Sequence, residues 1–237
     1  MAYSSPVAVV TGASRGIGAA TAVALARHGV HVVLLARTQG GLEETDDAVR
    51  AAGGSATLLP IDLTKGEMLD PLGPTLLERF GRLDILLHNA GALGRLTPTP
   101  HILPRDWDAA IGVNLAATWR LIRTCGPLLL AAPAGRAVFV TSRVARAPRG
   151  YWGAYAAGKA GMEALVQCWV DETRNDRLRV NLFDPGPTRT RMRAEAMPGE
   201  EPTSLPPPEE IAPYLAAACL PAETRHGALL SPEMGRA

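Results

Sequence analysis

Six short runs rich in valine, isoleucine and leucine recur along the chain, separated by segments of helical length and composition. They lie at Val7–Thr11, His31–Ala36, Ala56–Pro60, Asp84–Leu87, Ala137–Thr141 and Arg179–Phe183. Their residues are apolar at consecutive positions, which is typical of strands covered on both faces. We therefore predict an α/β fold, a doubly wound parallel sheet of about seven strands with helices on both faces. Ligands in such folds bind outside the carboxyl ends of the strands.

Length, charge and cysteine spacing limit the possible class of protein. The 237 residues suffice for one substantial core, and we expect a single domain over residues 1–237. The 24 basic and 23 acidic residues give a net charge of +1, so no overall field attracts nucleic acid or a membrane surface. Cys125, Cys168 and Cys219 are widely spaced, which argues against disulfides and a zinc site, and we predict no metal.

The hydropathy pattern predicts a cytoplasmic protein whose partners are small molecules. No apolar run approaches the roughly 18 residues that a membrane span needs. The segment Met1–Ser5 is too short and polar for a signal sequence.

Prolines interrupt the C-terminal third of the chain. Six of them lie between Pro198 and Pro213 and exclude a continuous helix or a central strand there. We predict a surface loop at Pro198–Pro213, within a proline-rich substrate loop or lid over residues 190–213.

A glycine-rich turn follows the first apolar run. Its sequence is Thr11-Gly12-Ala13-Ser14-Arg15-Gly16-Ile17-Gly18, and a helix is predicted to follow over Ala19–His28. Glycine permits positive φ and close approach of the backbone, and the first N–H groups of a helix are free to bind a pyrophosphate. A simple tight turn is the alternative interpretation.

Tyr155 lies four positions before Lys159, one of only two lysines in a chain with 22 arginines. Positions i and i+4 share one face of a helix, so the ammonium can lie beside the phenol and favour its ionised form. A lysine also exchanges protons, which a guanidinium does not. The pair predicts acid–base chemistry, although short motifs also arise by chance.

These features together resemble the short-chain dehydrogenase/reductase family over nearly the whole chain. The matching residues, in the order and spacing of the family, are Gly12, Gly16, Gly18, Asn89-Ala90-Gly91, Asn114, Ser142, Tyr155, Lys159 and Pro185-Gly186. Ser142 precedes Tyr155 by the thirteen positions that are usual in that family. The chain is most similar to a bacterial subgroup of short-chain oxidoreductases of unassigned substrate, which share Leu-His-Asn-Ala-Gly, Trp-Gly-Ala-Tyr and Pro-Gly-x-Thr-Arg-Thr segments.

The resemblance implies four catalytic residues. Tyr155 would give a proton to a carbonyl oxygen as hydride reaches the carbon. Lys159 would lower the pKa of Tyr155 and hold the nicotinamide ribose. Ser142 would bond the substrate oxygen, and Asn114 would anchor a water that relays protons. The alternatives are a strand-end cap for Ser142 and a locally bonded helix residue for Asn114.

The resemblance also implies a set of cofactor contacts. They are Gly12, Ser14, Arg15, Gly16, Ile17, Gly18, Arg37, Asp62, Leu63, Asn89, Ala90, Gly91, Asn114, Tyr155, Lys159, Pro185, Gly186, Thr188 and Thr190. Asp62 would bond the adenine amino group, or alternatively cap a helix. His88 stands where asparagine is more common in the family, and we expect it to be a packed core histidine. Gly158 replaces a frequent serine, which we expect to loosen a turn of helix.

Cofactor preference depends on the end of the second run, Leu34-Leu35-Ala36-Arg37. A carboxylate there would bond the ribose 2′-hydroxyl of NAD, and none is present. Arg37, together with Arg15 in the glycine turn, offers two guanidiniums that can grip a 2′-phosphate. We predict NADP(H), with NAD(H) as the alternative; the other interpretation is two ordinary solvated arginines.

We therefore expect an NADP(H)-dependent oxidoreductase that interconverts a carbonyl and a secondary alcohol. Arg143 and Trp152 flank the catalytic residues and would contact the substrate, or else be an exposed arginine and a packing tryptophan. The alternatives are a non-catalytic NADP-sensing protein, or an epimerase or dehydratase on the same scaffold. The family implies a homodimer or homotetramer, for which Trp119, Cys168 and Trp169 would suit either the interface or the chain's own core.

Overall fold

The described chain, residues 4–232 of a computed structural model, contains one sheet of seven parallel strands. The strands are β1 (Val7–Thr11), β2 (His31–Ala36), β3 (Ala56–Pro60), β4 (Ile85–His88), β5 (Arg136–Val140), β6 (Arg179–Phe183) and β7 (Leu229–Leu230). They lie in the order β3-β2-β1-β4-β5-β6-β7, which reverses between β1 and β4. This order defines a doubly wound sheet and confirms the predicted fold class. Residues 1–3, which belong to the segment Met1–Ser5, and residues 233–237 lie outside the described residues.

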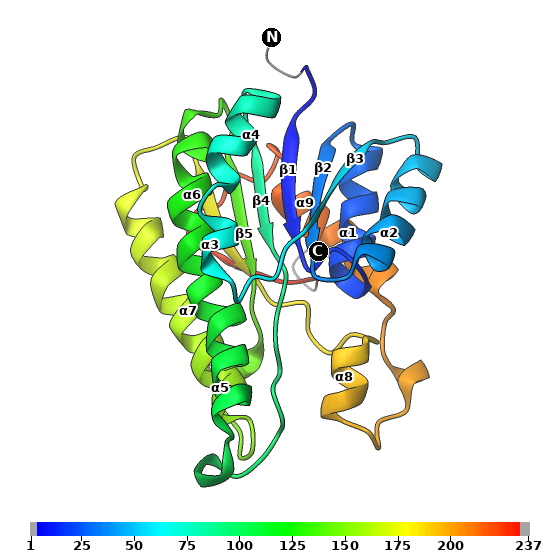
Figure 1. Cartoon of the computed structure of the whole chain (residues 1–237), viewed down its shortest axis with the longest axis vertical. Helices are drawn as coiled ribbons and strands as arrows, with labels where there is room; N and C mark the ends of the chain where they lie inside the picture. Colours follow the sequence, from blue (N-terminus) through cyan, green and yellow to red (C-terminus); the bar gives the residue numbers. More distant parts are fainter. Residues whose placement is uncertain (1–3, 233–237) are drawn as a thin grey trace.

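Nine helices and four short helical turns of the described residues surround the sheet. The helices are α1 (Gly16–Arg27), α2 (Gln39–Ala51), α3 (Gly66–Leu69), α4 (Leu72–Phe80), α5 (Pro104–Ile111), α6 (Ala117–Ala131), α7 (Gly153–Glu172), α8 (Arg191–Ala196) and α9 (Pro208–Cys219). The turns are η1 (Thr99–His101), η2 (Gly112–Ala116), η3 (Arg143–Ala145) and η4 (Pro202–Ser204). Helices α3, α4, α6 and α7 lie on one face of the sheet, and α1, α2 and α9 lie on the other (Figure 1).

The two-sided cover explains the consecutive apolar runs. Val7 and Val9 of β1 belong to the core under α4, α6 and α7, whereas Ala8 and Val10 belong to the core under α1, α2 and α9. Successive side chains of a strand point to opposite faces, so both sets of positions must be apolar. All four residues are fully buried.

Two strands differ from their predicted bounds by one residue. The predicted strand Asp84–Leu87 is observed at Ile85–His88, and the predicted strand Ala137–Thr141 is observed at Arg136–Val140. The Asp84 carboxylate accepts a hydrogen bond from the Val7 main-chain N–H at 2.9 Å and binds Arg82, so this side chain caps the amino-terminal end of β1. The apolar pattern could not reveal this because hydrophobicity does not record side-chain hydrogen bonds.

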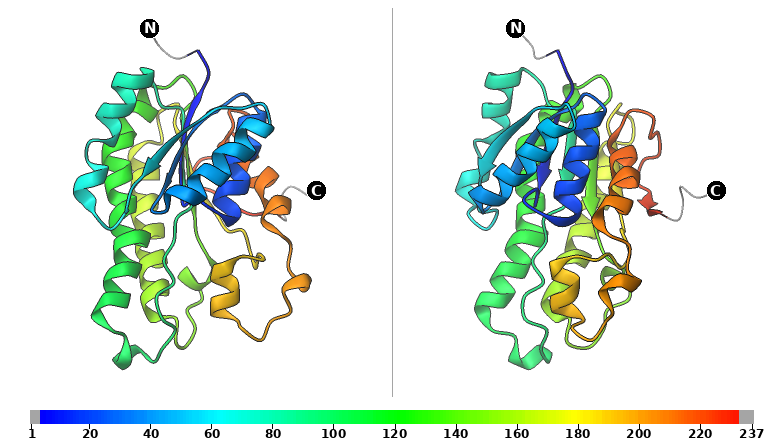
Figure 2. Two further views of the ribbon diagram at one scale, coloured as in Figure 1. Left: turned by 45° about the vertical axis from the view of Figure 1, so that its right-hand side comes forward. Right: turned by 90° about the vertical axis from the view of Figure 1, so that its right-hand side faces the viewer.

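The proline-rich segment contains more helix than the sequence predicts. The expected surface loop at Pro198–Pro213 ends early, because α9 begins at Pro208 and includes Pro213. Proline is tolerated in the first turn of a helix, where its missing N–H would have no intrahelical partner. Helix α8 and the segment after it project beyond the carboxyl ends of the strands (Figure 2).

Candidate active site

The carboxyl ends of the strands open into a cleft of about 2020 Å³. It is lined by almost every candidate residue: Gly12, Ser14, Arg15, Gly16, Ile17, Arg37, Asp62, Leu63, Asn89, Ala90, Gly91, Ser142, Arg143, Trp152, Tyr155, Lys159, Pro185, Gly186, Thr188 and Thr190. Gly18 and Asn114 lie behind its wall. The structure therefore brings together residues from strand ends that are far apart in the sequence.

The glycine turn is shaped by close contacts that exclude side chains. Gly12 and Gly16 have φ of +66° and +59°, in the left-handed region that favours glycine. A Cβ on Gly18 would lie 2.3 Å from the Gly12 carbonyl oxygen and 2.4 Å from Asn89 Nδ2. Helix α1 begins at Gly16, three residues before the predicted start, and no side chain caps its N-terminus. Its first N–H groups are thus available to an anionic group, and the turn fits a pyrophosphate.

His88 holds the strand ends behind this turn. The Thr11 hydroxyl oxygen accepts hydrogen bonds from the N–H groups of Asn89 and Ala90, both at 3.1 Å. A hydroxyl has two lone pairs and one proton, so Thr11 donates to His88 Nδ1, 2.8 Å away. Burial, with a smaller contribution from the Lys159 charge, lowers the pKa of His88 to about 3. His88 is a neutral, fully buried core histidine, as the sequence predicts.

Asn114 lies in the π-helical turn η2 between α5 and α6, where it is fully buried. Its Oδ1 accepts from the Ala92 N–H at 3.2 Å, and its Nδ2 donates to the Ala92 carbonyl at 2.8 Å. The side chain therefore fixes the loop that follows β4. A Cβ on Gly158 would lie 3.0 Å from Asn114 Cβ, so Gly158 allows α7 to approach η2 closely.

Tyr155 and Ser142 meet at the end of β5. Tyr155 lies on α7 and is 7 % exposed. Burial raises the pKa of Tyr155 to about 12; a hydrogen bond with Ser142 lowers it and the charge of Asp184 raises it. The phenol is therefore protonated at neutral pH, which is the form of a proton donor.

Lys159 differs from its expected arrangement. Its Nζ donates to the Val140 carbonyl oxygen at 2.6 Å, so the ammonium is held by the end of β5. Burial lowers the pKa of Lys159 to about 8, against the opposing charges of Glu163 and Asp184. Burial is the largest effect on the pKa of Tyr155, and the lowering of that pKa by Lys159 stays a prediction. The i, i+4 spacing predicts that Tyr155 and Lys159 share one face of α7, but it does not predict how deeply the two side chains are buried.

One end of the cleft contains Asp62, Arg15 and Arg37. Asp62 Oδ1 accepts from the Thr64 N–H at 3.0 Å and from its hydroxyl at 2.8 Å. Burial would raise the pKa of Asp62, but these bonds and the nearby Arg37 hold it below its usual value. Lys65, not Asp62, is the N-cap of α3, so the capping alternative is not observed. Both arginines are exposed.

The other end of the cleft is apolar around Tyr155. Leu93, Val144, Tyr155 and Ala196 form a small buried cluster, with Trp152, Met192 and Met197 packed against it. Trp152 and Tyr155 meet edge to face, with ring centroids 6.1 Å apart. Trp152 thus both packs and lines the cleft, and Arg143 is exposed at its rim.

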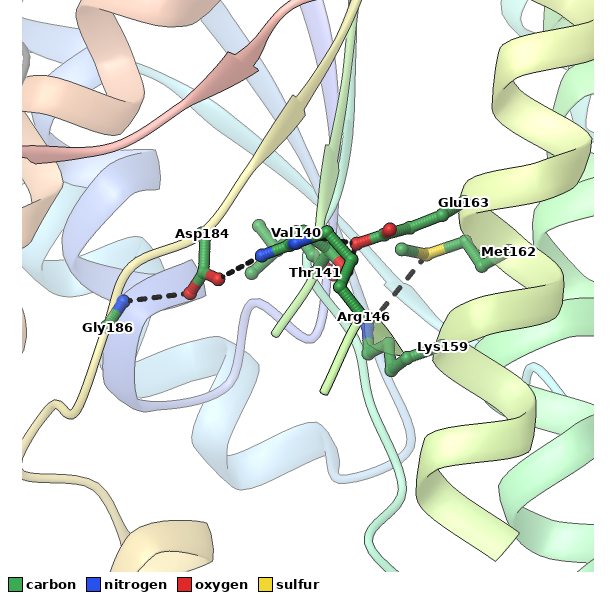
Figure 3. Close-up of polar contacts among 8 residues, drawn as sticks. All are labelled: Val140, Thr141, Arg146, Lys159, Met162, Glu163, Asp184 and Gly186. Atoms are coloured by element: carbon green, nitrogen blue, oxygen red, sulfur yellow. Dashed lines mark hydrogen bonds and ion pairs between the residues drawn. The ribbon is translucent and has the colours of Figure 1, made fainter. Parts of the chain in front are cut away.

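The sequence analysis missed three charged residues beside the site. Arg146 joins the carboxylates of Glu163 and Asp184 (Figure 3), and of these three only Asp184 lines the cleft. Two signals could have found them. Glu163 follows Lys159 by one helical turn, and Asp184 immediately precedes Pro185-Gly186.

The chain matches the family model of the short chain dehydrogenases over residues 6–201, and it belongs to this family. YciK of Escherichia coli strain K12, an uncharacterized oxidoreductase, is 40 % identical over 210 residues, which cover 87 % of this chain and 83 % of YciK. A short chain dehydrogenase of Escherichia coli CFT073 complexed with NADPH is similar in structure, with 36 % identity and a TM-score of 0.91 over 98 % of each chain. The same values hold for a short chain dehydrogenase of Shigella flexneri 2a strain 301 complexed with NADP. These findings confirm the resemblance, and the protein is an oxidoreductase of this family.

Residues 4–232 contain neither a membrane-spanning helix nor a cluster of metal ligands. None of the helices there combines the length and apolarity that a bilayer crossing requires. The same residues bring together no group of three histidine, cysteine, aspartate or glutamate side chains that could hold a metal ion.

Gly18→Ala is expected to weaken cofactor binding and to lower the free energy of unfolding by roughly 1–3 kcal/mol, because the new methyl overlaps the Gly12 backbone. Gly40→Ala is the matched control: Gly40 lies on α2, and a Cβ there meets open space. Thermal unfolding and NADPH fluorescence titration measure the two effects. An unchanged Gly18→Ala variant would contradict the close approach.

Proposed function

We propose that the protein is an NADP(H)-dependent oxidoreductase that interconverts a carbonyl and a secondary alcohol. The observation that carries this proposal is the convergence of Ser142, Tyr155 and Lys159 on the cleft that the glycine turn enters. When bound, NADPH supplies the hydride that reaches the carbonyl carbon. Tyr155 gives the proton to the carbonyl oxygen, and Ser142 bonds that oxygen. The product is the alcohol, and the reverse sequence oxidises it.

The residues of the cleft fit a dinucleotide phosphate. The uncapped start of α1 would hold the pyrophosphate, and Thr188 and Thr190 line the same cleft. Thr190 approaches the glycine turn: its Cγ2 would be 3.6 Å from a Cβ on Gly16. Arg15 and Arg37 supply the positive charge for a 2′-phosphate, and β2 ends without a carboxylate. The NADP and NADPH complexes of the two similar structures support this assignment.

We assign the substrate end of the cleft to residues 190–213. Met192, Ala196, Leu205 and Pro206 of this segment line the cleft opposite Trp152. The apolar cluster around Tyr155 would hold the carbon body of the carbonyl compound. We also place the protein in the cytoplasm, where its three free cysteines stay reduced.

We further propose a homodimer or homotetramer that associates through α6 and α7. Trp119 of α6 is 47 % exposed, and Cys168 of α7 is exposed beside it, in a hollow of about 280 Å³. Trp169 packs mainly in the core of its own chain, and its remaining exposed edge lines the same hollow. An exposed tryptophan between two arginines, Arg120 and Arg123, is typical of an interface residue.

NADPH is expected to bind more tightly than NADH, by at least about tenfold, because each charge-assisted bond contributes roughly 1.5–3 kcal/mol. Arg37→Asp should remove this preference. Arg177→Asp, an exposed arginine outside the cleft lining, is the control and should keep it. Fluorescence titration gives both dissociation constants. Equal affinities in the wild type would overturn the NADP assignment.

Tyr155→Phe is expected to abolish hydride transfer while leaving NADPH binding nearly intact, since it removes one hydroxyl. Tyr151→Phe is the matched control, because Tyr151 lies in the turn before α7, is 63 % exposed and should keep full activity. Lys159→Ala should weaken both cofactor affinity and turnover. NADPH absorbance with a carbonyl panel measures turnover. Retention of more than about a tenth of the rate by Tyr155→Phe would exclude Tyr155 as the acid.

Trp119→Glu is expected to dissociate the oligomer, because a carboxylate would be buried in the apolar interface. Leu77→Glu is the control: Leu77 is 56 % exposed on α4 and does not line the hollow beside Trp119. Light scattering after size exclusion measures the mass of each variant. A monomeric wild type would refute this interface.

A further inference from the structure

The guanidinium of Arg146 connects three segments that carry the candidate site. It binds Glu163 of α7 through Nη1, and its Nη2 donates to Asp184 Oδ2 at 2.6 Å. Arg146 itself follows η3, directly after the segment that bears Ser142. The strand end, the catalytic helix and the loop after β6 therefore meet at one side chain (Figure 3).

Each carboxylate also makes a second contact within its neighbourhood. Glu163 Oε1 accepts from the Thr141 hydroxyl at 2.5 Å, which ties α7 to the residue before Ser142. Asp184 Oδ1 accepts from the Gly186 N–H at 3.1 Å, which shapes the start of the Pro185-Gly186 loop. The carboxylates are only 13 % and 17 % exposed, so loss of their shared cation would leave two poorly hydrated negative charges.

We propose that Arg146 is a positioning residue of this site, which fixes Ser142, Lys159 and the Gly186 loop relative to one another and sets the charge around Lys159. This inference goes beyond the proposed function but rests on it for the role of Ser142 and Lys159. Arg146 does not line the cleft and touches no reacting group. It acts through Glu163 and Asp184.

The charges around Lys159 determine how its pKa should change when Arg146 is removed. Glu163 on the same helix and Asp184 on the loop after β6 both raise the pKa of Lys159. His88 from β4 is neutral, and the phenol of Tyr155 is protonated below pH 12. The Arg146 charge offsets the two carboxylates. Removal of Arg146 should therefore raise the pKa of Lys159, whereas neutralisation of Glu163 should lower it further.

The lysine content of the sequence allows the pKa of Lys159 to be measured without any substrate. Lys65 and Lys159 are the only lysines, so a protein labelled with [ε-¹³C]lysine gives two NMR signals. Lys65 is exposed, and the variant Lys65→Arg leaves the Lys159 signal alone. A pH titration then reads the midpoint of Lys159 directly in the full chain.

Arg146→Met is expected to raise the Lys159 midpoint by at least about 0.5, and Glu163→Gln to lower it by a similar amount. Arg146→Lys keeps the charge and should keep the midpoint near that of the wild type. Arg225→Met, which breaks an ion pair with Glu223 outside the cleft lining, is the control and should leave the midpoint unchanged. Shifts of the same sign in Arg146→Met and Glu163→Gln, or no shift in either, would overturn the proposal.

Turnover supplies the second readout. Arg146→Met should lower kcat at least about tenfold, and Arg146→Lys should recover part of it, because a misplaced Ser142 cannot bond the substrate oxygen. Wild-type kcat in Arg146→Met would also overturn the proposal. If the wild type reduces no carbonyl, the proposed function fails, while opposite midpoint shifts still establish that Arg146 sets the Lys159 charge. If Arg146→Met does not fold, Glu163→Gln, which keeps the side-chain shape, gives the test. A lower Lys159 midpoint in this variant supports the proposal, and a higher or unchanged midpoint overturns it.

Discussion

The buried ammonium of Lys159 is the constraint around which the site is organised. Lys159 is 2 % exposed, and the fall of its pKa from 10.5 to about 8 means that its charged form is disfavoured in the folded state. This costs on the order of 3 kcal/mol at neutral pH. The cost is full below pH 8 and disappears as the pH rises toward 10.5. This free-energy cost is reduced by the Val140 carbonyl, Glu163 and Asp184. The end of β5, α7 and the loop after β6, which carry these groups, must therefore keep fixed positions.

A second constraint is the contact between the glycine turn and the end of β4. Asn89 Nδ2 donates to the carbonyls of Thr11 and Gly12 at 3.2 and 3.3 Å, and Gly18 packs against the same atoms. Because β1 and β4 flank the point where the strand order reverses, this contact closes the floor of the cleft. The neutral His88 supports it from below through Thr11. The backbone N–H groups at the start of α1 are thereby left facing the cleft.

Sequence patterns predicted the parts of this molecule that depend on local chemistry. Six of the strands were located within one residue, because strands buried on both faces need consecutive apolar residues, whereas the two-residue strand β7 is too short for such a run and was not located. The candidate residues gather in one cleft because a parallel sheet brings its strand ends to one edge. The start of α9 at Pro208 was missed, since prolines in a first helical turn and in a loop have the same sequence signature. The contacts of Arg146 were also missed, because they join residues 17 and 38 positions apart.

The pKa values of Tyr155 and Lys159 could not be predicted from their spacing, and they change how the pair acts. With a phenol pKa of about 12, Tyr155 holds its proton throughout the neutral range and is ready to donate it. Oxidation of an alcohol requires the ionised phenol, which a nearby ammonium stabilises. Lys159 carries that charge fully only below pH 8. In the proposed reaction, the protonated phenol is the form that donates a proton to a carbonyl, and Glu163 and Asp184, which raise the pKa of Lys159, favour the charged lysine that the reverse reaction would use.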